Sequence, residues 1–245
     1  DRVRMHWYRF VIAPANVEYI RRYGSTVRRG PFEGMRYLDG MERTSVDLVG
    51  KVSGTYEREL HPSVTRWLSQ SPSLILNVGC AEGYYAVGLA RSLPQSRVVA
   101  YDISAEARAQ CAEMARINDV RNVEIESECT PTTLAAIDTA DVALLCDCEG
   151  YEKTLLDPRL VPALRLWRII VELHDAIDPS IGKTITERFE PSHEIKSIPS
   201  APTDSTGLAE FDFMSPRQRR AALTERPTAM SWLDMRPRAA TPVDF

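Results

Sequence analysis

The sequence has no long hydrophobic run and no excess of basic residues, and its first residues do not resemble a secretion signal. None of its apolar stretches approaches the roughly 20 residues that span a bilayer, and residues 1–10 are charged and aromatic. A net charge of −4 disfavours general affinity for nucleic acid. We therefore expect a cytoplasmic protein with no nucleic-acid partner and no membrane partner.

Cysteine is also scarce, and its spacing excludes common structural roles. The five cysteines are an odd number on segments with strand or helix patterns, which indicates buried thiols rather than a disulfide framework. Cys146 and Cys148 form only a CxC pair without a second pair, which disfavours a structural zinc site. Because the sequence begins with Asp1, we expect the numbering to start inside a longer gene product or after processing.

The length and the 44% hydrophobic content suit one α/β core with an appendage. Residues up to about Leu60 lack a clean period and include the turn-rich segment 28–37. We expect residues 1–60 to form an N-terminal cap or lid and residues 61–245 to form the cofactor-binding domain.

A strand, a glycine turn and a helix follow one another near residue 80. Apolar residues run from Leu74 to Val78, the turn contains Gly79 and Gly83, and a helical pattern follows. Glycines let the backbone pass close to a ligand, and the first N–H groups of the helix point into the same space. A second apolar run ends at Asp102, where an acidic side chain accepts hydrogen bonds from ribose hydroxyls. The segment predicts a nucleotide-type cofactor site.

The turn lacks the third glycine of a dinucleotide site. GxGxxG loops place their glycines against a pyrophosphate, whereas here three residues separate Gly79 from Gly83. One of these residues is Glu82, whose carboxylate repels pyrophosphate but tolerates a cationic sulfonium. The loop therefore favours S-adenosylmethionine, and an NAD-dependent oxidoreductase is the alternative.

Strands and helices alternate through the rest of the chain. The pattern predicts helices at 56–68 with an interruption near Pro62, 105–118 with Ser104 as N-cap, 130–137, 154–166 and 182–189, and strands at 98–101, 123–127, 141–146, 169–173, 194–198 and 230–235. We expect residues 199–226 to form a long loop with one short helix. Parallel strands end at one sheet edge, so one crevice should gather the residues that follow them: Gly79, Asp102, Glu128, Asp147 and His174.

Three segments resemble the FkbM-like family of class I S-adenosylmethionine-dependent methyltransferases. They are Leu74 to Ala90, the D-x-E-G-x-E element from Asp147 to Glu152, and Val171 to Asp175. The resemblance covers about Gly54 to Arg238. It implies an α/β fold with a Rossmann-like, doubly wound sheet, and S-adenosylmethionine as cofactor.

The resemblance also implies which residues would bind the cofactor. Gly79, Glu82, Gly83 and the adjoining Tyr84 would line the methionine and ribose portion, and Asp102 would bind the ribose diol. Glu128 and Cys129 would border the adenine, and Asp147 would lie beside the sulfonium and the acceptor. Asn77 departs from the family, because many class I enzymes have an acidic residue there to contact the methionine amino group.

We identify Asp147, His174 and Glu149 as candidate catalytic residues. A carboxylate at a sheet edge beside a cation stays ionised and can orient or deprotonate a hydroxyl. His174 follows a strand directly and has an ordinary pKa near neutrality, which suits a general base, although a lone histidine is often structural. Glu149 has the alternative role of capping the following helix.

A divalent metal is a further alternative. Possible ligands are Asp147, Glu149, Glu172, His174 and Asp175. Nothing in their spacing demands a metal, so we rank metal-free catalysis first.

The family implies transfer of a methyl group to a hydroxyl on a small molecule or glycan, such as a sugar or polyketide-like acceptor. Arg28, Arg29 and Tyr56 in the cap are candidate acceptor contacts, although packing under a surface loop is the simpler role for most cap aromatics. A noncatalytic S-adenosylmethionine-binding module is the alternative from a different functional class.

Overall fold

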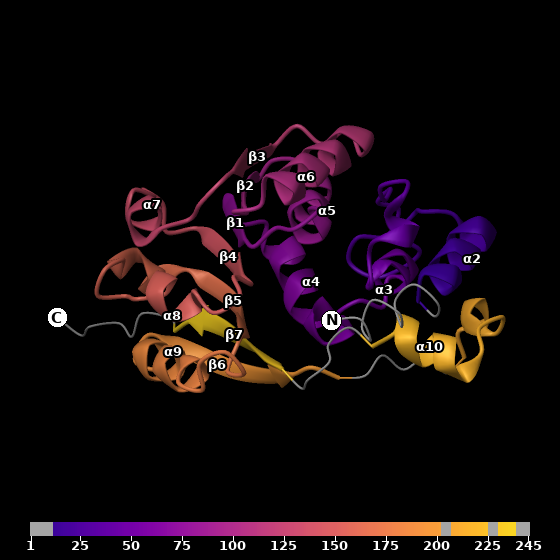
Figure 1. The fold of residues 1–245 in the computed structure, drawn as a ribbon. Coiled ribbons are helices and arrows are strands. Elements are labelled where there is room, and N and C mark those ends of the chain that lie inside the picture. The colour runs from indigo at the N-terminus through magenta and orange to yellow at the C-terminus, as the bar shows by residue number, and fades with distance from the viewer. Residues whose placement is uncertain (1–11, 202–206, 225–229, 239–245) are drawn as a thin grey trace.

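The computed structural model describes residues 12–201, 207–224 and 230–238. Its centre is a sheet of seven described strands in the order β3-β2-β1-β4-β5-β7-β6 (Figure 1). The strands are β1 (Leu74–Val78), β2 (Arg97–Tyr101), β3 (Val123–Glu126), β4 (Val142–Cys146), β5 (Arg168–Leu173), β6 (His193–Pro199) and β7 (Ser231–Pro237). β1 to β5 are parallel, and β7 runs antiparallel to both β5 and β6. The predicted doubly wound α/β fold is confirmed.

Helices cover both faces of this sheet. They are α2 (Ala13–Tyr23), α3 (Leu48–Ser53), α4 (His61–Gln70), α5 (Tyr84–Ser92), α6 (Ala105–Ile117), α7 (Pro131–Ala135), α8 (Glu152–Leu155), α9 (Ile181–Phe189) and α10 (Pro216–Ala222), with short 3-10 turns η2 (Met41–Arg43), η3 (Arg58–Leu60), η4 (Pro162–Leu166) and η5 (Ala209–Phe211). One hydrophobic cluster packs the helices α2, α3, α4, α5, α6 and α10 against one face of the sheet. A second cluster packs α7, α8 and α9 against the other face. None of the described helices is long and apolar enough to cross a membrane.

Local sequence explains the central elements. All residues of β1 and β4 are buried, as expected for strands with a helical layer on each face. The predicted N-cap of α6 is confirmed, because the Ser104 hydroxyl accepts a hydrogen bond from the Ala107 N–H at 3.2 Å.

The helix predicted at 154–166 is wrong. α8 ends at Leu155, and only the short turn η4 follows, at Pro162–Leu166. Pro158 and Pro162 lack an N–H and disfavour a helical residue before them, so they separate the two turns. Pro62 starts α4 rather than interrupting a helix, because proline fits the first turn. The segment expected to be a long loop with one short helix holds the short helix α10, and also the turn η5, among its described residues.

The segment before Leu60 packs directly against the sheet's helices. Phe32 contacts Tyr84 edge to face, with ring centroids 5.2 Å apart. Further along the chain, α10 lies beside α2 and α3 (Figure 1). There Arg29 Nη1 lies 2.5 Å from Glu210 Oε1, which links the segment to a part of the chain about 180 residues later.

Candidate functional site

A cavity of about 450 Å³ opens where the parallel strands β1 to β4 end. It is lined by Val78, Gly79, Ala81, Tyr101, Asp102, Ile103, Ser127, Glu128, Cys129, Asp147, Cys148, Glu149 and Tyr151. Six of the sequence-predicted site residues are among them, at the sheet edge where ligands of open α/β proteins bind. The strand ends therefore meet in one crevice, and His174 adjoins it through Asp147 and Glu149.

Gly79 allows the loops after β1 and β4 to touch. Its φ is +77°, and a Cβ at this position would lie 1.6 Å from the backbone oxygen of Asp147. Only glycine fits such a contact. The sequence suggested that this glycine makes room for a ligand, and the structure shows that it makes room for the loop carrying Asp147.

Asp102 is held rigidly at the rim of the cavity. Its Oδ2 accepts a hydrogen bond from the Ala81 N–H at 2.9 Å, and its Oδ1 accepts one from the Ser104 N–H at 2.8 Å. Each carboxylate oxygen keeps a further lone pair. The carboxylate can therefore accept bonds from the two hydroxyls of a ribose without moving.

Asn77 has an unsatisfied amide beneath the glycine loop. Its side chain is only 1% exposed, and neither amide atom has a hydrogen-bond partner among the described residues. A buried amide without partners is costly, and it fits a site completed by a polar ligand. S-Adenosylmethionine fits these residues: Asp102 suits its ribose, and Asn77 provides a dipole near the expected methionine portion.

The side chain of Glu82, in the glycine loop, is not part of the cavity lining and contacts Lys51 and Tyr37 instead. Its Oε1 is 2.6 Å from Lys51 Nζ, and the Tyr37 hydroxyl donates a hydrogen bond to the same oxygen. Burial raises the pKa of Glu82, but the attraction and hydrogen bonds of Lys51 and Tyr37 outweigh burial and lower it. The cap therefore neutralises the charge that the sequence assigned to the cofactor's surroundings.

Gly83 and Tyr84, where the loop meets α5, are also absent from the cavity lining. A Cβ on Gly83, whose φ is +96°, would lie 2.8 Å from Cys111 Sγ. Tyr84 is buried between the rings of Phe32 and Tyr56. Both residues shape the loop from its core side.

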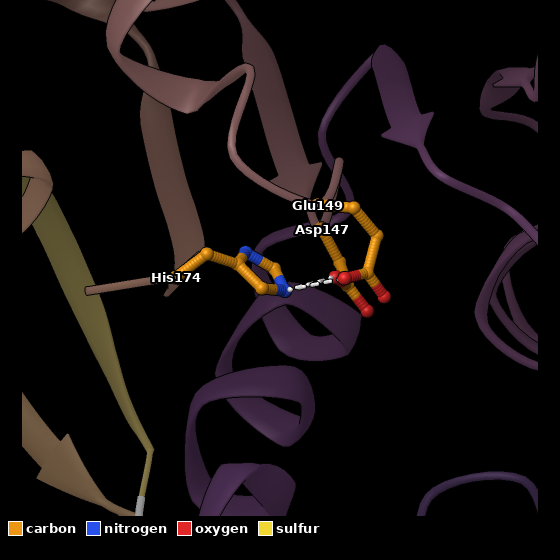
Figure 2. A group of neighbouring side chains, drawn as sticks. All are labelled: Asp147, Glu149 and His174. Carbon is orange, nitrogen blue, oxygen red and sulfur yellow. Dashed lines mark ion pairs between the residues drawn. The ribbon is translucent and has the colours of Figure 1, made fainter. Parts of the chain in front are cut away.

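His174, Asp147 and Glu149 converge at the ends of β5 and β4 (Figure 2). The Nε2 atom of His174 lies 3.5 Å from Asp147 Oδ1 and 3.4 Å from Glu149 Oε2. On the other side of the ring, Nδ1 is 2.6 Å from Oε1 of the buried Glu152. This carboxylate also accepts the N–H groups of Cys148 and Gly150, at 3.3 and 3.1 Å. Glu152 thus fixes both the imidazole and the loop that faces it.

The charges in this group shift its protonation. Burial alone would lower the pKa of His174, but the Glu152 hydrogen bond and the surrounding carboxylates raise it to about 9. Burial raises the pKa of Asp147 well above its ordinary value, and nearby Glu172 and Glu57 add to this. The site therefore concentrates negative charge and retains protons readily.

The predicted acceptor contacts take part in the packing of the cap. Arg29 binds Glu210 and donates to the Ser53 backbone oxygen at 2.7 Å. Arg28 lies over the Tyr23 ring, 5.0 Å from its centroid. Tyr56 packs against Tyr84, with ring centroids 5.3 Å apart. None of the three predicted contacts is among the residues that line the described cavity.

The sequence analysis missed Lys51, Tyr37 and Glu152. Lys51 and Tyr37 lie in the segment without a clean period, where no local signal links them to Glu82. Glu152 had a signal, since it ends the D-x-E-G-x-E element.

Comparisons with known proteins bear on the family and the fold. Residues 75–157 match a family model described as a methyltransferase domain. A search of curated proteins found no match. The putative O-methyltransferase from Klebsiella pneumoniae is similar in fold, with 11% identity, a TM-score of 0.51, and coverage of 92% of this chain and 90% of that one. Cofactor-bound Rv0187 from MTB is similar in fold, with 15% identity, a TM-score of 0.50, and coverage of 71% of this chain and 78% of that one.

The two structural likenesses show the fold, which is that of class I methyltransferases. The match of residues 75–157, which include the glycine loop, Asp102 and Asp147, supports a methyltransferase that depends on S-adenosylmethionine. The acceptor, the atom that is methylated and the FkbM-like subfamily remain predictions.

Proposed function

We propose that this protein transfers a methyl group from S-adenosylmethionine to a hydroxyl oxygen on a small molecule or glycan. The observation that carries the proposal is one cavity with Asp102 at its rim and Asp147 and Glu149 in its wall, next to His174. Asp102 suits a ribose. The group of Asp147, Glu149 and His174 suits a hydroxyl that must lose a proton. When bound, the cofactor would supply an electrophilic methyl group on a positively charged sulfur.

Cofactor binding uses the residues at the ends of β1 to β3. Asp102 accepts hydrogen bonds from the ribose hydroxyls, and Glu128 and Cys129 border the adenine. The resemblance places Asn77, whose buried amide has no partner among the described residues, near the methionine portion.

Asp147 and His174 would orient the acceptor and take its proton. The pKa of His174 is raised to about 9 and that of Asp147 well above its ordinary value, so the fraction of each group that can accept the hydroxyl proton grows as the pH rises. Glu149 would help to position the hydroxyl. Most of the acceleration would come from holding the acceptor in line with the methyl–sulfur bond and excluding water.

The remaining parts of the proposal concern the cap and the acceptor. We assign residues 1–60 as the cap and residues 61–245 as the methyltransferase domain, within the FkbM-like subfamily and in the cytoplasm. The acceptor would be a sugar or polyketide-like molecule, and the predicted acceptor contacts Tyr56, Arg28 and Arg29 lie outside the lining of the described cavity. Residues 1–11 of the cap lie outside the described residues.

Two other functions make different predictions. An NAD-dependent oxidoreductase would bind NADH, although the loop lacks the dinucleotide glycines. A noncatalytic module would bind S-adenosylmethionine but show no methyl transfer. The convergence of Asp147, Glu149 and His174 favours an enzyme over such a module.

Calorimetric titration with S-adenosylhomocysteine and, separately, NADH tests the cofactor. Micromolar binding of S-adenosylhomocysteine alone is the expected result, and binding of NADH alone would overturn the proposal. Formation of S-adenosylhomocysteine with a panel of sugar and polyketide hydroxyls then tests catalysis. Asp147→Asn and His174→Asn should each lower turnover by about 100-fold or more, and unchanged turnover would remove these residues from the mechanism.

A further inference from the structure

The gap between His174 and the two carboxylates has the size of a metal site. One ligand atom from each of Asp147, Glu149 and His174 lies within 4.8 Å of the others. The separations of 3.4 and 3.5 Å from Nε2 are long for charged hydrogen bonds, which measure about 2.7–2.9 Å. With metal–ligand bonds of about 2.1 Å, neighbouring ligand atoms lie roughly 3.0–3.4 Å apart. The three atoms therefore surround a space that a metal ion fits.

A ring nitrogen and two carboxylates face one another across this gap. His174 is only 4% exposed, and its Nε2 forms long ion pairs with Asp147 and Glu149. Oδ1 of Asp147 is also buried without a hydrogen-bond partner in the described chain. Figure 2 shows the imidazole directed at both carboxylates. Because these atoms face one another at separations too long for a strong hydrogen bond, the space between them can hold a cation.

The surroundings of His174 are those of a metal ligand. Histidine ligands usually donate their second ring nitrogen to a carboxylate, which fixes the tautomer and the ring orientation. Glu152 makes this contact with Nδ1 at 2.6 Å, and it also accepts the Cys148 and Gly150 N–H groups. One buried carboxylate thus orients all three candidate ligands.

From this geometry we propose that Asp147, Glu149 and His174 bind a divalent cation that takes both nitrogen and oxygen ligands, such as Mn²⁺. The sequence ranking placed metal-free catalysis first, and the structure changes that ranking by bringing three of the five candidate ligands together. Asp175 is occupied elsewhere, since its Oδ1 accepts the Gly182 N–H at 2.8 Å in the first turn of α9.

The role of the cation rests on the proposed function. Three protein ligands leave coordination positions open, and Asp147 and Glu149 face the cavity. With its Nε2 on the cation, His174 would act as a ligand and not as the base. An acceptor hydroxyl bound at an open position would have a lower pKa and lose its proton more readily. The preferred acceptor would then be one that can place an oxygen on the cation.

Titration of metal-free protein with Mn²⁺, followed by electron paramagnetic resonance and calorimetry, tests the site. One Mn²⁺ should bind per chain, and Glu149→Gln should weaken it by about tenfold or more. The matched control is Glu187→Gln on the exposed face of α9, which should leave the affinity unchanged. Absence of saturable binding, or equal affinities for the two variants, would overturn the proposal.

Glu152→Gln supplies a second variant that removes no ligand. It should lower Mn²⁺ affinity by about 10- to 100-fold, provided its thermal transition shows that it folds. Glu149 is 82% exposed, so its variant keeps the test valid even if Glu152→Gln fails to fold. Titration with S-adenosylhomocysteine on the same samples separates the two proposals. If the protein binds S-adenosylhomocysteine but not Mn²⁺, only the proposed cation site is overturned. If it binds Mn²⁺ but not S-adenosylhomocysteine, only the proposed methyltransferase function is overturned.

Discussion

Lys51 Nζ lies 2.6 Å from Glu82 Oε1, and both side chains are buried. Lys51 belongs to α3 in the cap, and Glu82 belongs to the glycine loop. The Tyr37 hydroxyl donates to the same carboxylate, so two segments of the cap satisfy one charged residue of the loop. A buried contact of this kind ties the position of the glycine loop to that of the N-terminal segment.

Replacing Lys51 with methionine should destabilise the protein by about 3–5 kcal/mol. The change keeps a long apolar side chain but leaves Glu82 buried without its counter-charge. Urea unfolding followed by circular dichroism measures the effect. Lys183→Met is the control, because Lys183 is 79% exposed and should change stability by less than about 0.5 kcal/mol. Equal midpoints for the two variants would show that the buried pair is not important for stability.

The cost of Lys51→Met should depend on pH. In the native protein the pKa of Glu82 is lowered from 4.5, because Lys51 and Tyr37 together outweigh the raising effect of burial. A carboxylate with a depressed folded-state pKa adds stability that is present above the unfolded pKa and lost as pH falls through the folded value. The difference between the two proteins should therefore be largest near pH 7 and shrink below about pH 4.5. A pH-independent difference in unfolding free energy would contradict this.

Gly79→Ala should disrupt the site far more than a comparable change elsewhere. The new Cβ would collide with the Asp147 backbone oxygen, so the cost should exceed about 3 kcal/mol or prevent folding. Gly40→Ala is the matched control, since Gly40 has a φ of +87° but nothing within 4 Å of a Cβ. It should cost about 1–2 kcal/mol from backbone strain alone. Thermal unfolding compares them, and similar losses would contradict the predicted clash.

Asp102→Ala should weaken binding of S-adenosylhomocysteine by roughly 1–3 kcal/mol, or about 5- to 150-fold. The variant loses the carboxylate that we propose binds the ribose hydroxyls. Calorimetry measures the affinity, and circular dichroism checks that the variant is folded. Asp119→Ala, which removes an exposed carboxylate from the end of α6, should bind as the native protein does. Native affinity in a folded Asp102→Ala protein would remove Asp102 from the cofactor site.

Cys148 should be the first cysteine to react with iodoacetamide. It is partly exposed and lines the cavity, whereas the other four cysteines are buried. Under the proposed function, S-adenosylhomocysteine should slow the reaction at Cys148 by covering the cavity. Mass spectrometry of digested protein identifies the modified residue, and Cys148→Ser should abolish the fast phase. Fast labelling of another cysteine would contradict the burial seen here.

The central fold could be predicted because its signals are local. The run from Leu74 to Val78 is apolar enough for a buried strand, and Ser104 carries the side chain that a helix N-terminus needs. The failed helix at 154–166 shows the limit of periodicity, since apolar spacing favoured a helix that Pro158 and Pro162 interrupt. Both prolines disfavour a helical residue before them, whatever the apolar spacing around them.

The site was predictable only in part, for a physical reason. Residues that follow strands, such as Asp102 and Asp147, are brought to one edge by the parallel sheet itself. Lys51 reaches Glu82 across 31 positions through cap packing that has no periodic signal. The role of Gly79 was likewise hidden, because the atom that it accommodates belongs to Asp147, 68 residues later.

The place of β7 makes the order of synthesis matter. β7 lies between β5 and β6 in the sheet, although it follows both in the chain. On a ribosome, β5 therefore emerges with an edge that stays unpaired until residues 231–237 arrive, and unpaired edges invite aggregation. Asp234 on β7 also accepts hydrogen bonds from Ser63 and Arg66 of α4, at 2.7 and 2.5 Å. A nascent chain that stops short of this strand would leave α4 without these partners and β5 open to neighbouring chains.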